Sequence, residues 1–577
     1  MKRRLFAIML ALAMLCPMVL TGCGGGTQST DTGDDALNEE TIRETVSITM
    51  WVVTDKKTTE EAQAAVEEAF NEITKASFTT YVDLVFCTAD EYQAKLDQKF
   101  AEIDERIANG GSKRPAVTDT GVQYEVNELG VTVLKYPEIY ENQIDIVYIT
   151  GVDQLNSLVQ ADRLVSLNEA ISETGASKIL RDVIPDQFFK YSKVKDKFGN
   201  EKTFAIPNNR VVGEYTYLLV HKDFVTGDAN GDGTITGDEI KPTYVNFDNI
   251  TSINDCKTVI EYIKQNNTNF VPVLEKFDNP YIQYWSEDGS FSLLASRVDP
   301  ARDFSGNSWD NKLVLSNVFS ISASVAENAT YFTDFELLMK KYEVGNYFAT
   351  DVEATKKAQN FGVAVMKGDS SIVDQYKNNY YIKVMAKPEL NDSNIFTSFY
   401  GVTNYSINSE RALEVITMLN TNSELRNTLQ YGVEGVHYEL DEKGRVERFN
   451  DDYIMDINTT GNVFIAYPEE DMPDDAWERG VAVNLDMKVG VITGFWSARS
   501  TIDPTIINNL AQQSKIYKER MDACKTVEEL AAFFETAKAE IFKNEAYLAA
   551  IDTKNPLSYA STYSTWYDAL YPAPSEA

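Results

Sequence analysis

Residues 145–171, DIVYITGVDQLNSLVQADRLVSLNEAI, combine a short apolar run with an amphipathic stretch that follows it directly. The run from Gln143 to Ile149 is rich in β-branched residues and predicts a strand in the interior of a sheet. Residues 152–161 carry apolar side chains at helical spacing and predict a helix, and residues 164–167 predict a short strand or turn. A strand followed at once by a helix is the building unit of a parallel α/β sheet.

The residues before this stretch repeat the same alternation. Strands are predicted over 46–53 and 80–86, and helices are predicted to begin at residues 58–59 and to cover 91–100. Strands that alternate with helices form βαβ units, so the expected fold class is α/β with a parallel sheet. Residues 107–135 break the alternation and are interpreted as an irregular insertion.

The N-terminus has the layout of an export signal. Basic residues at 2–4 precede an apolar run over 5–20, and Leu-Thr-Gly then stands directly before Cys23. The run is shorter than a membrane-spanning helix needs, so residues 1–22 are predicted to be a signal peptide. The Leu-Thr-Gly-Cys sequence resembles the lipobox of bacterial lipoproteins, which implies lipidation of Cys23; the alternative is a plain secretory signal with an incidental cysteine. Residues 23–44 are Gly-, Ser- and Thr-rich and acidic, and they predict a flexible tether.

Composition excludes several classes of protein. The formal net charge of −35 argues against binding to nucleic acid, which is itself an anion. Cys87, Cys256 and Cys524 are odd in number and widely spaced, which does not fit a disulfide framework, so they are expected to be small buried residues. The chain has no CxxC motif, so a zinc–thiolate site is not expected. The chain has only two histidines and no motif of a hydrolase, metalloprotease or nucleotide-binding protein, so no catalytic residue is expected.

Three stretches in order resemble segments of one family. They are residues 145–171, FAIPNNRVVGEYTYLLVHKDFV at 204–225, and the stretch at 399–440 that contains Tyr-Gly-Val-Glu-Gly-Val-His-Tyr. Behind a lipobox, they resemble the carbohydrate-type, family 1 extracellular solute-binding proteins of bacterial ABC importers. The resemblance implies a periplasmic-binding-protein-like α/β fold with two discontinuous lobes and a hinge. By position, lobe 1 is expected at 45–208 and 396–435, lobe 2 at 213–392 and 440–577, and the hinge near 206–208 and 393–397.

An acidic loop at 228–239, DANGDGTITGDE, matches the EF-hand calcium pattern at every fixed position. The pattern spaces oxygen ligands around Ca²⁺, and Gly233 permits the sharp turn. No second loop is found, so a paired sensor or a complete dockerin module is not expected, and the loop is interpreted as an insertion in lobe 2 that holds a structural calcium ion. The alternative is an acidic loop without an ion. The predicted ligands are Asp228, Asn230, Asp232, Thr234, Thr236 and Glu239.

Sugars present apolar C–H faces to aromatic rings and hydroxyl groups to polar side chains. Aromatic and polar residues at strand ends, beside the expected hinge and in aromatic–acidic clusters are therefore candidates for ligand contact. Each has an alternative interpretation as a packing residue. The candidates are Trp51, Asp55, Asn209, Arg210, Trp285, Glu287, Trp309, Tyr400, Trp496 and Arg499.

The resemblance implies a binding protein on the extracellular face of the cytoplasmic membrane. It would be a lipid-anchored monomer that captures a sugar or oligosaccharide and delivers it to an ABC permease. One alternative is a surface glycan-degrading enzyme, which needs two carboxylates about 5–9 Å apart. A peptide-binding transport lipoprotein and an adhesion or scaffold lipoprotein are the others; tandem repeats, which would favour the last, are absent.

Overall fold

The computed structural model of the chain describes residues 45–111, 143–228, 233–266, 269–278, 332–470, 472–490, 493–499, 501–541 and 543–570, together with the backbone of four short strands at 124–126, 132–134, 282–284 and 295–297. The predicted signal peptide, Cys23, the tether and most of the insertion lie outside these residues. Within them, no helix combines the length and the apolar character needed to cross a membrane.

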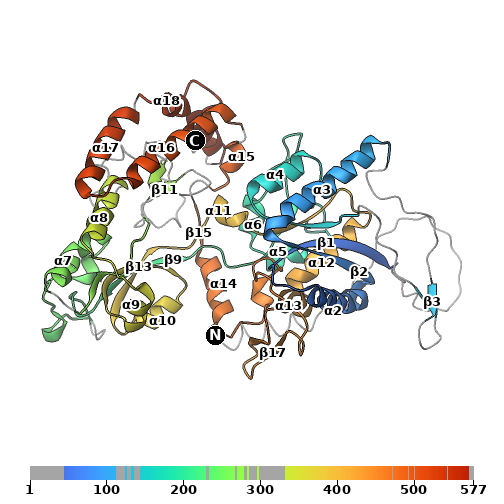
Figure 1. Cartoon of the computed structure of the whole chain (residues 1–577), viewed down its shortest axis with the longest axis horizontal. Coiled ribbons are helices and arrows are strands. Elements are labelled where there is room, and N and C mark those ends of the chain that lie inside the picture. The colour runs from blue at the N-terminus through green and yellow to red at the C-terminus, as the bar shows by residue number, and fades with distance from the viewer. Residues whose placement is uncertain are drawn as a thin grey trace, which may run out of the picture. The chain divides into compact units, whose positions relative to one another are not determined.

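The first sheet has five strands in the order β2-β1-β5-β16-β8. Strands β1, β2 and β5 are parallel, as the sequence predicts, whereas β16 pairs antiparallel with both β5 and β8. Helices α2 and α3 lie on opposite faces of this sheet (Figure 1), as right-handed crossovers on either side of β1 require. The bounds are β1 Val46–Thr54, β2 Thr80–Thr88, β5 Ile146–Ile149, β8 Ala205–Pro207, β16 Phe399–Val402, α2 Glu60–Phe78, α3 Ala89–Ala108 and α4 Val152–Gln160.

Local chemistry explains two of these elements. Helix α2 begins where expected because the Thr59 side chain accepts a hydrogen bond from the backbone N–H of Ala62. Strand β5 is fixed by the buried carboxylate of Asp145, which accepts hydrogen bonds from the Thr49 N–H on β1 (2.9 Å) and from the Ser406 hydroxyl. Asp145 thus joins three segments that are far apart in the sequence.

The second sheet has four strands in the order β10-β13-β9-β14. Helices α7 and α8 contribute to an apolar core on one of its faces, and α9 and α10 contribute to a separate core on the other. The bounds are β9 Tyr215–His221, β10 Val271–Val273, β13 Phe361–Gly368, β14 Tyr380–Ala386, α7 Lys257–Gln265, α8 Phe332–Val344, α9 Val352–Ala358 and α10 Ser371–Tyr376. We call each sheet with its packed helices a lobe.

The segment after residue 440 differs from the expected division of the chain. Tyr453 and Met455 belong to the core of the first lobe, and the N–H of Asn462 donates to the carbonyl of Leu419 at 3.1 Å. Residues 440–470 therefore pack with lobe 1, whereas the sequence placed them in lobe 2. The helices and strands of this part are α12 Ser409–Thr421, α13 Ser423–Tyr431, β17 Tyr438–Leu440 and β18 Val446–Arg448.

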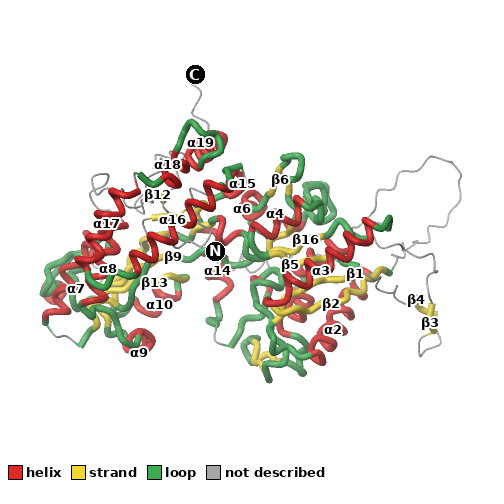
Figure 2. Tube along the Cα trace, turned by 45° about the horizontal axis from the view of Figure 1, so that its top comes forward, coloured by secondary structure: helices red, strands yellow, loops and turns green. Residues whose placement is uncertain are grey.

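The C-terminal part is wholly helical in the described residues (Figure 2) and has a core of its own. Leu337 of α8 packs against this core, which links it to the second lobe. Its helices are α16 Pro504–Asp522, α17 Val527–Ile541, α18 Glu545–Ile551 and α19 Tyr559–Leu570. The remaining short elements are α5 Ile179–Val183, α6 Asp186–Tyr191, β6 Val194–Lys195, β7 Glu201–Lys202, β3 Tyr124–Val126, β4 Thr132–Leu134, β11 Ile282–Tyr284 and β12 Ala295–Arg297.

In the part of the chain that the structure describes, three segments connect the lobes. The first crossing, residues 208–214, joins β8 to β9, and the second crossing, residues 387–398, joins β14 to β16 through β15 (Glu389–Leu390) and α11 (Asp392–Ile395). The third crossing, residues 472–490, contains α14 (Ala476–Asp486) and β19 (Lys488–Val489), and β19 pairs with β15 in parallel. The hinge predicted near residues 206–208 lies at the end of β8 and the start of the first crossing, and the one predicted near 393–397 lies in the second crossing; the third crossing was not predicted.

Candidate functional site

The carboxyl ends of β1 and β5 meet at one edge of the first sheet, where ligands bind in many open α/β folds. Asp55 and Thr150 follow these strands and are exposed. The Thr150 hydroxyl donates to the backbone carbonyl of Thr397 at 2.9 Å, and the Tyr148 hydroxyl donates to the same oxygen at 3.1 Å. The second crossing is therefore fastened to this edge of lobe 1.

A loop at residues 454–459 completes the edge. The backbone N–H of Asp55 donates to the carbonyl of Ile454 at 3.1 Å, and the Ser398 hydroxyl donates to the carbonyl of Asn458 at 2.6 Å. The side chains left exposed there carry carboxylate, hydroxyl and amide groups, which can bind the hydroxyls of a sugar. We call this set the lobe 1 edge: Asp55, Thr150, Thr397, Asp456 and Asn458.

Of these five residues, only Asp55 was identified from the sequence. Thr150 directly follows a predicted strand, and this position could have identified it as a candidate for ligand contact. Asp456 and Asn458 come from a segment that the sequence assigned to the other lobe, so nothing in their local pattern placed them here.

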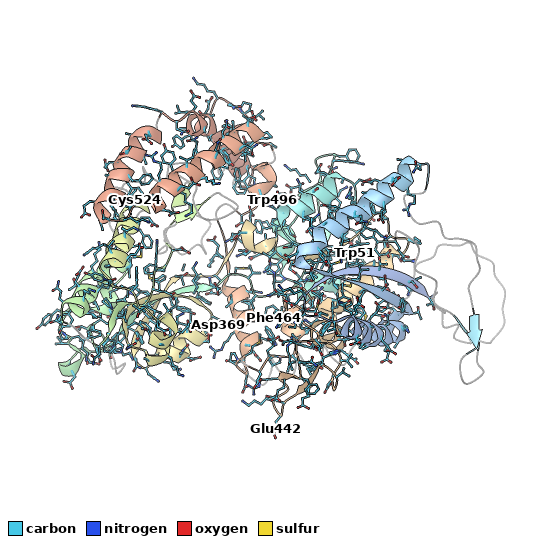
Figure 3. The ribbon with its side chains drawn as sticks, in the orientation of Figure 1. Trp51, Asp369, Glu442, Phe464, Trp496 and Cys524 are labelled. Atoms are coloured by element: carbon cyan, nitrogen blue, oxygen red, sulfur yellow. The ribbon has the colours of Figure 1, made fainter. Side chains whose placement is uncertain are left out.

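Trp496 lies beside the lobe 1 edge. It begins helix α15 (Trp496–Arg499), is half-buried, and its ring meets Phe396 edge-to-face at 5.0 Å between centroids. The carbonyl of Phe396 in turn accepts the N–H of Gly151, which immediately follows Thr150. Figure 3 labels this tryptophan on its short helix. Asp55 and Trp496, two candidates that are far apart in the sequence, thus contact two segments of this region: Asp55 the 454–459 loop and Trp496 the second crossing.

Trp51 and Tyr400 occupy the interior of lobe 1. Trp51 is 7% exposed and Tyr400 is fully buried. A series of edge-to-face ring contacts runs from Trp51 through Tyr92 and Tyr148 to Tyr400, whose hydroxyl donates to the carbonyl of Thr459 at 2.7 Å. Neither ring lies at the surface of this structure, and both pack the core beneath the lobe 1 edge.

Asn209 and Arg210 brace the first crossing. The guanidinium of Arg210 donates to the carbonyl of Asn394, and burial lowers its pKa to about 10. The side chain of Asn209 donates from Nδ2 to the carbonyl of Val183 at 2.6 Å, and the backbone carbonyl of Asn209 accepts the N–H of Val463 at 2.8 Å. Both side chains were candidates for ligand contact, but the described contacts use them to hold the crossing in place.

Four candidates have no described side chain. Trp285, Glu287 and Trp309 lie outside the described residues, and Arg499 is described only as part of the backbone of α15. Their proposed contact with ligand stays a prediction.

The third crossing is hydrogen-bonded to the other two crossings and to the start of β9. Asn484 on α14 donates from Nδ2 to the carbonyl of Arg210 at 2.8 Å and accepts the N–H of Val212 at 2.9 Å. The carboxylate of Asp486 accepts hydrogen bonds from Tyr215 at 2.8 Å and from Lys387 at 2.7 Å. One end of α14 therefore holds the start of β9 and the start of the second crossing together.

The predicted calcium loop is described in part. Asn230 and Asp232 lie outside the described residues, and among the residues described no group of three or more His, Cys, Asp or Glu forms a metal site. Asp228 accepts the N–H of Gly233 at 2.8 Å, and Glu239 accepts the N–H of Thr236 at 3.0 Å. The predicted calcium ligands that the structure describes are Asp228, Thr234, Thr236 and Glu239.

Both ends of that loop approach one tyrosine. Burial raises the pKa of Tyr381 on β14, and the carboxylates of Glu239 and Asp228 raise it further.

Comparison with solved structures identifies the fold. The N-glycan transport solute binding protein NgtS from Streptococcus pneumoniae superposes with a TM-score of 0.55 at 16% identity, over 91% of this chain and 99% of that one. The chain has the solute-binding-protein fold. An extracellular solute-binding protein from Bifidobacterium longum subsp. infantis covers 92% of this chain and 99% of its own, at 13% identity and a TM-score of 0.42.

Sequence comparison gives a second finding. A carbohydrate ABC transporter substrate-binding protein from Streptococcus pneumoniae serotype 4 is 31% identical over 138 residues. The match covers 22% of this chain and 28% of that relative, so it spans just over a quarter of the relative's length. No protein-family model matches the chain. These findings confirm the resemblance to solute-binding proteins that the sequence motifs indicated.

Proposed function

We propose that this protein is the substrate-binding component of an ABC importer and that it captures a sugar or oligosaccharide. One observation supports this most strongly: the three crossings join two sheet-bearing lobes, and the second crossing is fastened to an exposed polar edge beside Trp496. An indole ring can stack on the C–H face of a sugar, while hydroxyl, amide and carboxylate groups bind its hydroxyls.

The proposed action is binding without chemistry. Ligand contacts that exist only when the lobes are closed shift the population toward the closed form, which the permease then recognises. Thr150, Thr397 and Asn458 provide uncharged hydrogen-bonding groups on the lobe 1 side, and Asp55 and Asp456 provide carboxylates. The chain would bind and release its ligand unchanged.

The export and anchoring features belong to the same proposal. Lipidation of Cys23 would hold the protein at the extracellular face of the membrane, and residues 23–44 would give the lobes reach. Such an anchor keeps a monomeric binding protein close to its permease.

We also propose that the 228–239 loop binds one calcium ion with a structural role. Its spacing places six oxygen-bearing residues at the ligand positions of the EF-hand pattern, and Ca²⁺ takes six to eight oxygen ligands. The ion would stabilise lobe 2 and would not contact the ligand.

A thermal-shift screen tests the proposed function. Mono- and oligosaccharides of several linkages are compared with peptides, and the recovered carbohydrate is checked for cleavage. An oligosaccharide that raises Tm and is recovered intact supports the proposal. A response to peptides alone, or hydrolysis of the glycan, contradicts it.

A further inference from the structure

The segment that carries Trp496 is fastened along the second crossing. The N–H of Lys488 donates to the carbonyl of Pro388, and the N–H of Gly490 donates to the carbonyl of Leu390, both at 2.8 Å. The Thr493 hydroxyl donates to the same Leu390 carbonyl, also at 2.8 Å. We call residues 388–392, together with residues 488–490 and 493–496 that pair with them, the zipper.

The last contacts of the zipper are made by a side chain. Asp392 accepts the N–H of Gly494 at 2.6 Å through Oδ1 and the N–H of Trp496 at 3.2 Å through Oδ2. Hydrogen bonds to a charged acceptor are stronger than those between neutral groups, and two of them fix the direction of a backbone as well as its place. One carboxylate therefore determines where the chain enters α15.

The indole of Trp496 packs partly against the lobe 1 core. Its Nε1 is buried and has no hydrogen-bond partner among the described residues. Its described aromatic contact is with Phe396, which is on the second crossing, four residues after Asp392. Residues 392–396 therefore contact both the backbone and the ring of Trp496, in addition to the packing of the ring on the lobe 1 core.

We propose that Asp392 is a positioning residue for Trp496, and that the second crossing determines through it where the indole lies. The proposal rests on the proposed function in one respect, which is that Trp496 faces the ligand. Because the crossing also binds Thr150 through Thr397, Asp392 holds the aromatic part of the site in register with the polar lobe 1 edge. Domain closure that moves the crossing would carry Trp496 with it.

Collisional quenching of tryptophan fluorescence by acrylamide tests this without any ligand. The signal of Trp496 is taken as the difference between each protein and the same protein carrying Trp496→Phe. We expect Asp392→Ala to raise the quenching constant of Trp496 by about twofold or more, because loss of both hydrogen bonds frees the segment locally. Asp392→Asn keeps one acceptor oxygen and is expected to give an intermediate value.

Thr493→Ala is the matched control, since it removes a neighbouring zipper bond and leaves Asp392 in place. It is expected to lower Tm slightly without changing the quenching of Trp496. A wild-type quenching constant in Asp392→Ala would overturn the proposal. If Asp392→Ala does not fold, a wild-type value in Asp392→Asn overturns it equally. Failure of the oligosaccharide screen would leave this result unaffected, so the two claims can fail separately.

Discussion

The guanidinium of Arg479 lies 2.8 Å from the carboxylate of Asp374, so this ion pair joins α14 to α10 of the second lobe. Two residues earlier on the same helix, the indole Nε1 of Trp477 donates to the carbonyl of Ala466, which lies in the segment packed with lobe 1. Helix α14 is thus fastened to both lobes by two side chains of its first turn, which point to opposite sides of the helix. The third crossing therefore makes side-chain contacts with both lobes.

The Arg479–Asp374 pair should be sensitive to salt. Asp374 is half-exposed and also pairs with Lys377, so the contribution to stability is small and screened by ions. We expect Arg479→Gln to lower Tm by about 1–2 °C at low ionic strength and by less in 0.5 M salt. Calorimetry at both salt concentrations measures this, with Lys377→Gln as the control that leaves the link intact. An equal loss at the two salt concentrations would show that the link is not electrostatic.

Asp145 should be essential to the stability of lobe 1. Replacing it by Ala leaves the buried N–H of Thr49 and the Gln143 amide without the carboxylate that they share at 2.9 and 2.8 Å. We expect a loss of about 3 kcal/mol, since buried hydrogen bonds to a charged group are each worth one to three. Urea denaturation measures the loss. Asp153→Ala, at an exposed position of α4, is the control and should change little. A loss in Asp145→Ala no greater than in the control would contradict the role assigned to the carboxylate.

Ionisation of Glu389 on the second crossing should lower the free energy of unfolding as pH rises. Burial raises the pKa of its carboxyl to about 7, from an ordinary value near 4.5. The folded state therefore holds the proton more tightly than the unfolded state does, so stability is lost between about pH 4.5 and pH 7 and stays lower above that range. Glu389→Gln, which imitates the protonated form, should equal the wild type near pH 4.5 and exceed it at pH 8 by at most about 3 kcal/mol.

The measurement is Tm against pH for the two proteins. Burial also raises the pKa of Asp392 to about 6, but Asp392 is present in both proteins, so their difference isolates Glu389. A difference that does not grow with pH would contradict the assignment.

Calcium should stabilise the protein through the 228–239 loop. At a calcium concentration one hundred times its Kd, the expected gain is about 2.7 kcal/mol, which a chelator removes. Asp228→Ala should abolish the gain in a thermal-shift assay. Asp238→Asn changes an acid of the same loop that is not among the predicted ligands, and it should keep the gain. A chelator that abolished ligand affinity without changing Tm would falsify the structural role.

Local sequence pattern predicted the first half of lobe 1 well. Helix α2 begins directly after its Thr59 cap, and β1, β2 and β5 run parallel, because capping and hydrophobic periodicity depend on residues close in sequence. The antiparallel pairing of β16 with β5 and β8 depends on chain segments that return over a long distance. Their pairing left no local signal of direction.

The candidate site was predicted less completely for the same reason. The local sequence around a tryptophan near a strand end is the same whether its ring points to solvent or into the core. The ring of Trp51 packs against Tyr92 in the core. Asp456 and Asn458 reach the lobe 1 edge only because residues 440–470 pack on lobe 1, which burial of Tyr453 decides. Helix α14 has the pattern of an ordinary surface helix, so its contacts with both lobes could not be anticipated.

The most direct test of the account is isothermal titration of the purified protein with a panel of neutral oligosaccharides, followed by analysis of the recovered carbohydrate. We expect at least one oligosaccharide to bind with a stoichiometry of one, to be recovered intact, and to bind about tenfold more weakly to Trp496→Ala, a loss of about 1.4 kcal/mol. Thr493→Ala, which spares Trp496, should retain wild-type affinity. If no oligosaccharide binds, or if the bound glycan is recovered cleaved, the protein is not the binding component that its fold and site indicate.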